Sequence, residues 1–304
     1  MKRIIAMMLS VAMLSSVNTN AVDTVGTVSA NREKPADTMT KAEFAEFAKF
    51  AAANMPVKIN STTQIDKAEL LRDYYFDGFT DDEILSLEEN GIYLYNYQTD
   101  AEYMQERNLM TTAVGTPSMT FVERPAVSYD VNTTEWTLVA GGKWNDISWV
   151  PFLPKDIGGY EFVGYFFENS NIDTLSSSTK PRVQEVIASL LSVTADPNRQ
   201  DREVVNRNLN VTDLGGVGSY MQDYSLLGGH YVGQNYAIVV VYDSRFENVT
   251  GDVLSYYVHT DEEIELDKVE FQPVTAGNKV AFIPTPSYAT AKKGFEQKSS
   301  PLEL

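Results

Sequence analysis

The chain has 304 residues, of which 43% are hydrophobic, and its 24 basic and 42 acidic side chains give a net charge of −18 at pH 7. This hydrophobic content is enough for a packed core and excludes a chain that is disordered throughout. The acidic surface repels nucleic acid and anionic membranes, because phosphate binding needs clustered Lys and Arg, and it favours cations or basic partners. The lack of cysteine excludes disulfides, thiol catalysis and a lipid-anchored start.

Residues 1–21 have the layout of a secretory signal peptide. Lys2 and Arg3 precede an apolar stretch, and the small residue Ala21 closes a polar segment where a signal peptidase would cut. A second possible cut follows Ala30. The apolar stretch is shorter than the roughly 20 residues that cross a bilayer, and no second long apolar run follows. The sequence therefore predicts a secreted protein whose mature chain has no membrane span.

Residues 22–39 are polar and predict a flexible leader, and the region 40–112 that follows has helical patterning. Its helical segments each open with a Thr or Asp cap and a Glu three residues later, whose carboxylate reaches back to the cap. The four pairs are Thr40–Glu43, Asp66–Glu69, Thr80–Glu83 and Thr99–Glu102. They predict four helices, the last of them short. Residues 92–97 alternate in polarity and predict an isolated strand.

From about residue 113 the apolar period changes from helical to two, which is typical of strands. The predicted strands are 118–123, 125–130, 135–140, 160–167, 204–211, 236–242, 253–259, 264–272 and 279–283. Helical spacing after Pro181 predicts one helix within this region, at 183–191. Many short strands separated by turn residues favour a sandwich or barrel. The expected fold is α+β: a β-sandwich-like domain over 113–290, preceded by the small helical region and followed by a tail, 291–304.

Two turns in this region carry specific predictions. The segment 130–134 connects two predicted strands, and such a loop prefers Gly at its last position to allow a positive φ. Thr134 stands there, and a β-branched residue disfavours positive φ, so the turn is expected to differ. The glycine-rich segment 215–219 lacks the Lys-Ser/Thr of a phosphate-binding loop and is interpreted as a tight turn.

Aromatic residues crowd the stretch from 136 to 167. Exposed aromatic rings stack on sugar rings, whereas buried ones fill a sandwich core. Strand alternation places Trp136 in the core. Trp144 and Trp149 flank a predicted loop and, with Tyr160, are the candidate binding residues.

Catalytic and metal-binding candidates are few. The chain has only two histidines, His230 in a predicted loop and His259 at a strand end near Asp261, and no Ser lies in a G-x-S-x-G elbow. The acidic cluster Asp261, Glu262 and Glu263 offers oxygen ligands for calcium, without the alternating spacing of a calcium loop. A second cluster, at 77–83, coincides with a predicted helix start, where negative charge is favoured. Apart from possible calcium, no cofactor is expected.

Several segments resemble uncharacterised exported proteins of Gram-positive bacteria. They are Ser128–Trp136, Gly158–Gly164, Tyr242–Phe246 and Tyr256–Thr260. The resemblance covers roughly 120–275, implies a β-rich secreted domain, and assigns no catalytic residue. Thr134 departs from the Gly usual in such turns.

The function expected from these features is that of a secreted, non-catalytic binding module. It would act at the cell surface or on extracellular polysaccharide, with a polysaccharide or a cell-surface protein as its partner. Two alternatives stay open: a secreted hydrolase with a His/carboxylate site, and a structural extracellular protein.

Overall fold

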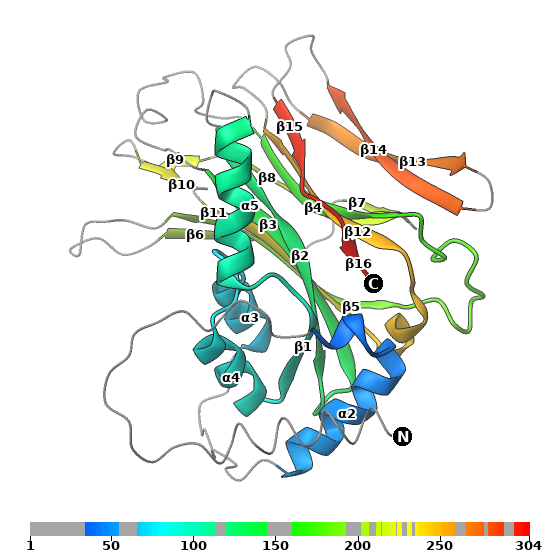
Figure 1. The fold of residues 1–304 in the computed structure, drawn as a ribbon. Helices are drawn as coiled ribbons and strands as arrows, with labels where there is room; N and C mark the ends of the chain where they lie inside the picture. Colours follow the sequence, from blue (N-terminus) through cyan, green and yellow to red (C-terminus); the bar gives the residue numbers. More distant parts are fainter. Residues whose placement is uncertain are drawn as a thin grey trace, which may run out of the picture.

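The structure is a computed structural model that describes most of the chain after residue 33 (Figure 1). The described residues are 34–54, 66–113, 120–144, 160–192, 202–206, 211–213, 215–222, 224–226, 230–232, 235–259, 266–276, 279–288 and 295–304. The expected signal peptide and most of the expected leader lie outside these residues. Among the described residues, no helix has the length and apolar character needed to span a membrane.

The helices begin where the capping pairs predict. They are α2 (Lys41–Asn54), α3 (Lys67–Tyr75), α4 (Asp81–Glu89) and α5 (Asp100–Ala113), with a short 3-10 turn, η1 (Pro35–Asp37), before them. At α4 the Thr80 hydroxyl accepts a hydrogen bond from the Glu83 backbone, and the Glu83 carboxylate accepts one from the Thr80 backbone. Asp66 caps α3 by accepting from the backbone of Ala68. The fourth helix spans 14 residues and is therefore longer than predicted.

The first sheet has the strand order β1-β2-β3-β11-β5-β6, and its pairings are antiparallel. The strands are β1 (Ile92–Asn96), β2 (Thr120–Asp130), β3 (Glu135–Trp144), β11 (Asn235–Tyr242), β5 (Val183–Ser192) and β6 (Arg202–Asn206). The prediction that 92–97 forms an isolated strand is therefore wrong, because β1 pairs with β2. The two strands predicted at 118–123 and 125–130 form the single strand β2, which has a register shift after Glu123, next to Pro125. Proline lacks the N–H that a regular ladder requires.

The second sheet has the order β15-β12-β4-β8-β7, with β16 also paired to β12. Its strands are β15 (Phe295–Lys298), β12 (Asp252–His259), β4 (Tyr160–Glu168), β8 (Gly216–Gln222), β7 (Val211–Asp213) and β16 (Leu302–Glu303). The predicted tail thus contributes strands, and the predicted tight turn at 215–219 is mostly strand β8. Two hairpins, β9 (Tyr224–Leu226) with β10 (His230–Val232) and β13 (Leu266–Ala276) with β14 (Lys279–Tyr288), complete the sheets.

The main core lies where the two sheets face each other, which confirms the β-sandwich-like α+β fold. Tyr236 of β11 stacks on Tyr257 of β12 with ring centroids 3.8 Å apart. Tyr165 of β4 and Tyr242 of β11 share a hydrogen bond between their hydroxyls. Trp136 is fully buried in this core, as predicted. The short turn η3 (Ser244–Asn248) contributes Phe246 to the same cluster.

The helix predicted at 183–191 is wrong, because these residues form β5 in the first sheet. Val186 and Ala188 face the inter-sheet core, whereas Ile187 faces the helices on the other side. A strand that is buried on both faces is a continuous apolar run, and periodicity alone cannot separate such a run from a helix.

The turn between β2 and β3 has a positive φ at Thr134, although a β-branched residue there was expected to disfavour it. Thr134 has φ of 61°, and its backbone N–H donates to Asp130 O at 2.8 Å. The left-handed conformation costs roughly 1–2 kcal/mol for a residue other than Gly. The closed turn is therefore retained with local strain.

A second apolar cluster forms between the helices and the outer face of the first sheet. Leu71 of α3 and Leu87 of α4 pack with Val139, Ile187 and Val239 of the sheet. Figure 1 shows α3 and α4 beside the first sheet, with α5 extending along it. These helices cover the middle of the outer face and leave the part near the β2–β3 turn open.

Candidate functional site

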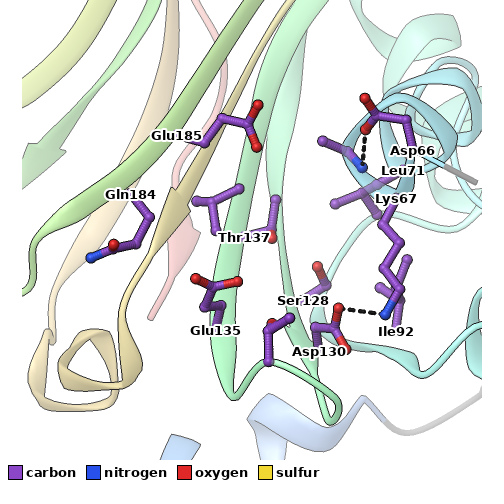
Figure 2. A pocket seen from close by; sticks show the side chains of 13 residues that line it. Asp66, Lys67, Leu71, Ile92, Ser128, Asp130, Glu135, Thr137, Gln184 and Glu185 are labelled. Carbon is purple, nitrogen blue, oxygen red and sulfur yellow. Dashed lines mark hydrogen bonds and ion pairs between the residues drawn. The ribbon is translucent and has the colours of Figure 1, made fainter. Parts of the chain in front are cut away.

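The open part of the outer face is a groove with a volume of about 680 Å³ (Figure 2). The start of α3 forms one wall, and β2, β3, β11 and β5 form its floor and far side. Its described lining residues are Asp66, Lys67, Ala68, Leu71, Ile92, Ser128, Asp130, Thr133, Glu135, Thr137, Gln184, Glu185 and Val241.

Strand register brings residues far apart in the sequence into one row across the floor. Ser128 lies opposite Thr137, Thr137 opposite Val241, and Val241 opposite Glu185. A register shift between β11 and β5 at Gln184 adds the Gln184 side chain to the rim. Side chains opposite each other on neighbouring strands lie about 5 Å apart, so this row is continuous.

The groove is anionic. Asp66, Asp130, Glu135 and Glu185 contribute four carboxylates, and Lys67 is the one basic side chain among the described lining residues. Asp130 and Glu135 lie directly opposite each other on β2 and β3, where like charges destabilise a sheet.

The lysine relieves part of this repulsion. The Lys67 ammonium pairs with Asp130 at 2.6 Å, and Figure 2 shows it reaching from the α3 side of the groove. Asp130 also accepts from the backbone of Asn132 at 2.8 Å, and Asp66 is occupied as the cap of α3. Glu135 and Glu185 add two further carboxylates to the floor.

Ser128 adds a hydroxyl to this floor. Its side chain is only 1% exposed and lines the groove. A hydroxyl that lines the groove can accept a hydrogen bond from a donor on a ligand.

This arrangement suits the binding of hydrogen-bond donors that carry positive charge. The described lining residues include no histidine, so they supply no imidazole base for hydrolysis. Carboxylates and hydroxyls accept hydrogen bonds from ammonium and guanidinium groups, and charge-assisted bonds of this kind are the strong ones.

Of the predicted binding residues, only the side chain of Trp144 is described, and it does not line this groove. Trp144 lies at the end of β3, is 5% exposed, and packs edge-on against His259 with centroids 5.3 Å apart. Its ring offers no open face to a sugar in this arrangement. Trp149 and the side chain of Tyr160 lie outside the described part, so their roles stay predictions.

Of the catalytic candidates, only the side chain of His259 is described, and it does not line the groove. His259 is buried at the end of β12. His230 lies in strand β10 and not in a loop as predicted, and its side chain is outside the described part. Asp261 is not among the described residues either.

The calcium predictions have no structural counterpart among the described residues. There, no group of three or more Asp, Glu, His or Cys side chains is arranged to hold a metal ion. In the second acidic cluster, Asp81, Asp82 and Glu83 form the first turn of α4, in agreement with the helix start predicted there. Glu262 and Glu263 fall outside the described residues, so calcium at that cluster stays a prediction.

Sequence reasoning missed the groove residues, although β3 carries a signal for them. Along its outer face the residues run from Glu135 and Thr137 to Val139, from polar to apolar. This change marks where the helical cover begins. Glu185 was out of reach, because its segment was interpreted as a helix.

Comparisons with known proteins add little to this geometry. No family model matches the chain, and no curated protein is significantly similar to it. One solved structure, described as "pH-induced modulation of Streptococcus parasanguinis adhesion by Fap1 fimbriae", is 11% identical over 56% of this chain and 74% of that chain, with a TM-score of 0.25. A TM-score this low carries no argument.

Proposed function

We propose that this protein is a non-catalytic binding module that acts outside the cytoplasm and takes a basic segment of a partner protein into the groove. The observation that supports this proposal is the anionic floor: Glu185 lies at the far end of the strand row that starts at Ser128, and Glu135 lies beside that row, opposite Asp130. The signal-peptide pattern at residues 1–21 and the resemblance to exported proteins support the compartment.

The charge of the chain supports a basic partner over a neutral one. The net charge of −18 attracts cationic segments from a distance and raises their rate of association. The described lining residues of the groove include no aromatic side chain on which neutral sugars could stack. A polysaccharide partner therefore requires a different surface, such as the one predicted around Trp149.

The test is a titration of the full chain with a fluorescent lysine- and arginine-rich peptide at low and high salt. Replacing the two floor carboxylates in Glu135→Gln/Glu185→Gln should weaken binding by at least about tenfold, since tenfold corresponds to ~1.4 kcal/mol. Salt should also weaken binding to the unaltered chain, because exposed charges are screened.

A matched control removes the same number of charges elsewhere. Glu89 at the end of α4 and Asp173 are both exposed and lie outside the groove. The variant Glu89→Gln/Asp173→Asn should bind like the unaltered chain. Equal loss in both double variants would reduce the effect to net charge, and equal binding of an uncharged peptide would rule out the proposal.

A further inference from the structure

The opposite end of the same sheet face holds a second cluster of reactive side chains. Lys143, near the end of β3, donates from its Nζ to Oδ1 of Asp77, which lies 66 positions earlier in the chain. Asp77 follows α3, where it and Gly78 have φ of 71° and 76°. A Cβ at Gly78 would lie 2.5 Å from Thr99 O, so only glycine fits there. This turn fixes the Asp77 carboxyl against Lys143.

An aromatic side chain lies against the amine. The Lys143 ammonium lies 5.1 Å from the centroid of the Tyr103 ring, which packs edge-on against Phe121. The Lys143 side chain is 14% exposed, whereas the Asp77 side chain is 61% exposed. The nitrogen is thus largely shielded from solvent, and the carboxyl has a path to water.

A buried carboxyl faces this pair from β2. Glu123 lies opposite Gly141, two positions from Lys143 on the same face of β3, and is 1% exposed. Its Oε1 has no hydrogen-bond partner in the described structure. Burial raises the pKa of Glu123 to about 8, the charge of Lys143 lowers it, and the charge of Asp77 raises it. The Asp77 backbone N–H also lowers this pKa, so Glu123 faces both partners of the ion pair.

We propose that Lys143 and Asp77 form an intramolecular amide bond, with Glu123 as the proton relay. The ion pair first exchanges one proton, which gives a neutral amine and a neutral carboxylic acid. The Lys143 nitrogen then attacks Cγ of Asp77. Glu123 takes a proton from the nitrogen and delivers one to the departing hydroxyl, so that an amide and one water form and Glu123 is unchanged. No oxidant, metal or further reactant is needed.

The geometry favours each part of this reaction. The contact between Lys143 Nζ and Asp77 Oδ1 holds the nitrogen beside the carboxyl carbon that it attacks. A carboxyl whose pKa lies near neutral pH is suited to give and take a proton. The product would tie the turn after α3 to β3 and hold the helices on the sheet in a chain that has no cysteine. This inference does not depend on the proposed function.

The test is the intact mass of the purified, folded full chain, with its N-terminus assigned by sequencing. The mass should be lower than that of the sequence by one water molecule. A protease digest should contain one branched product that joins the Asp77 and Lys143 peptides. Lys143→Arg and Asp77→Ala should both have the full mass and no branched product.

Glu123→Gln should also have the full mass, with folding checked by circular dichroism, and Glu123→Asp should recover part of the branched product. If Glu123→Gln fails to fold, Lys143→Arg and the digest still decide the proposal. Full mass in the folded unaltered chain would overturn it. So would loss of water that persists in Lys143→Arg, since a cyclic imide at Asp77–Gly78 loses the same water without a branch.

Discussion

The two ends of the outer face of the first sheet differ in what covers them, and β3 contributes to both. At one end Thr137 faces the open groove. Two residues further, on the same face, Val139 is fully buried beneath α3 and α4. At the far end Lys143 meets the turn after α3 and the ring of α5 residue Tyr103.

This comparison shows how one strand divides a surface into a stabilising part and a binding part. The covered part buries apolar side chains, which stabilise the fold roughly in proportion to the area removed from water. The open part instead keeps like charges opposite each other at Asp130 and Glu135, an arrangement that reduces stability. Mutations on the two parts should therefore change the free energy of unfolding by different amounts. At the groove some of them should also increase it.

The largest expected effect concerns the buried Glu123 at the covered end. Its pKa is raised from 4.5 to about 8. Between these values the folded chain holds a proton that the unfolded chain has lost, so the free energy of unfolding falls as pH rises. The full shift corresponds to ~5 kcal/mol, most of it lost by pH 8. Urea unfolding across this range should show the fall in Lys143→Arg, which keeps the charge and cannot form the amide.

The same urea unfolding experiments on Lys143→Arg/Glu123→Gln should not show this fall in the free energy of unfolding, because glutamine does not titrate. An identical slope in the two variants would mean that Glu123 titrates normally.

A smaller effect is expected from a matched pair on β3. Val139→Ala should reduce the free energy of unfolding by ~2 kcal/mol, because it removes two buried methyl groups and leaves a cavity. Thr137→Ala, on the same strand face, should change it by no more than about 0.5 kcal/mol. Chemical denaturation of both variants measures the contrast. Equal losses would mean that the groove floor is as tightly packed as the covered part.

The strained turn between β2 and β3 should respond in the opposite direction. Thr134→Gly should raise the free energy of unfolding by ~0.5–1 kcal/mol, because relief of the positive φ exceeds the entropy that glycine loses. Thermal unfolding would detect this as a higher midpoint temperature. A lower midpoint would show that the Thr134 side chain makes a stabilising contact.

The smallest effect is expected at the groove floor. Glu135→Gln should stabilise the chain by ~0.5 kcal/mol at low salt, since it removes the charge opposite Asp130, and this gain should shrink as salt increases. The same variant should bind basic peptides more weakly. Reduced stability would indicate that the Glu135 carboxylate stabilises the fold, which would weaken the case for a binding role.

The sequence predicted the fold class and the helix starts because these depend on local patterns. Capping at Thr80 and alternation around Trp136 are read from neighbouring residues. The prediction of a helix at 183–191 was wrong because burial on both faces removes the apolar period that separates a strand from a helix.

The candidate site depends on how the strands pair in register, and this pairing cannot be inferred from the sequence of one strand. Glu185 meets Val241 and Thr137 only through antiparallel pairing of segments about 50 residues or more apart in number. Lys143 and Asp77 likewise meet across 66 positions. In each case the sequence shows the chemical type of the side chain, but it does not show which residue lies opposite.

Methyl NMR of the full chain, titrated with the basic peptide, tests whether the groove is the binding surface. Val241 lines the groove, Val139 lies under the helices, and Val274 is exposed on the β13–β14 hairpin. If the peptide binds in the groove, the Val241 methyl signals should shift with saturation while those of Val139 and Val274 stay in place. Shifts at Val274 with Val241 unchanged would place the binding surface elsewhere and rule out the groove.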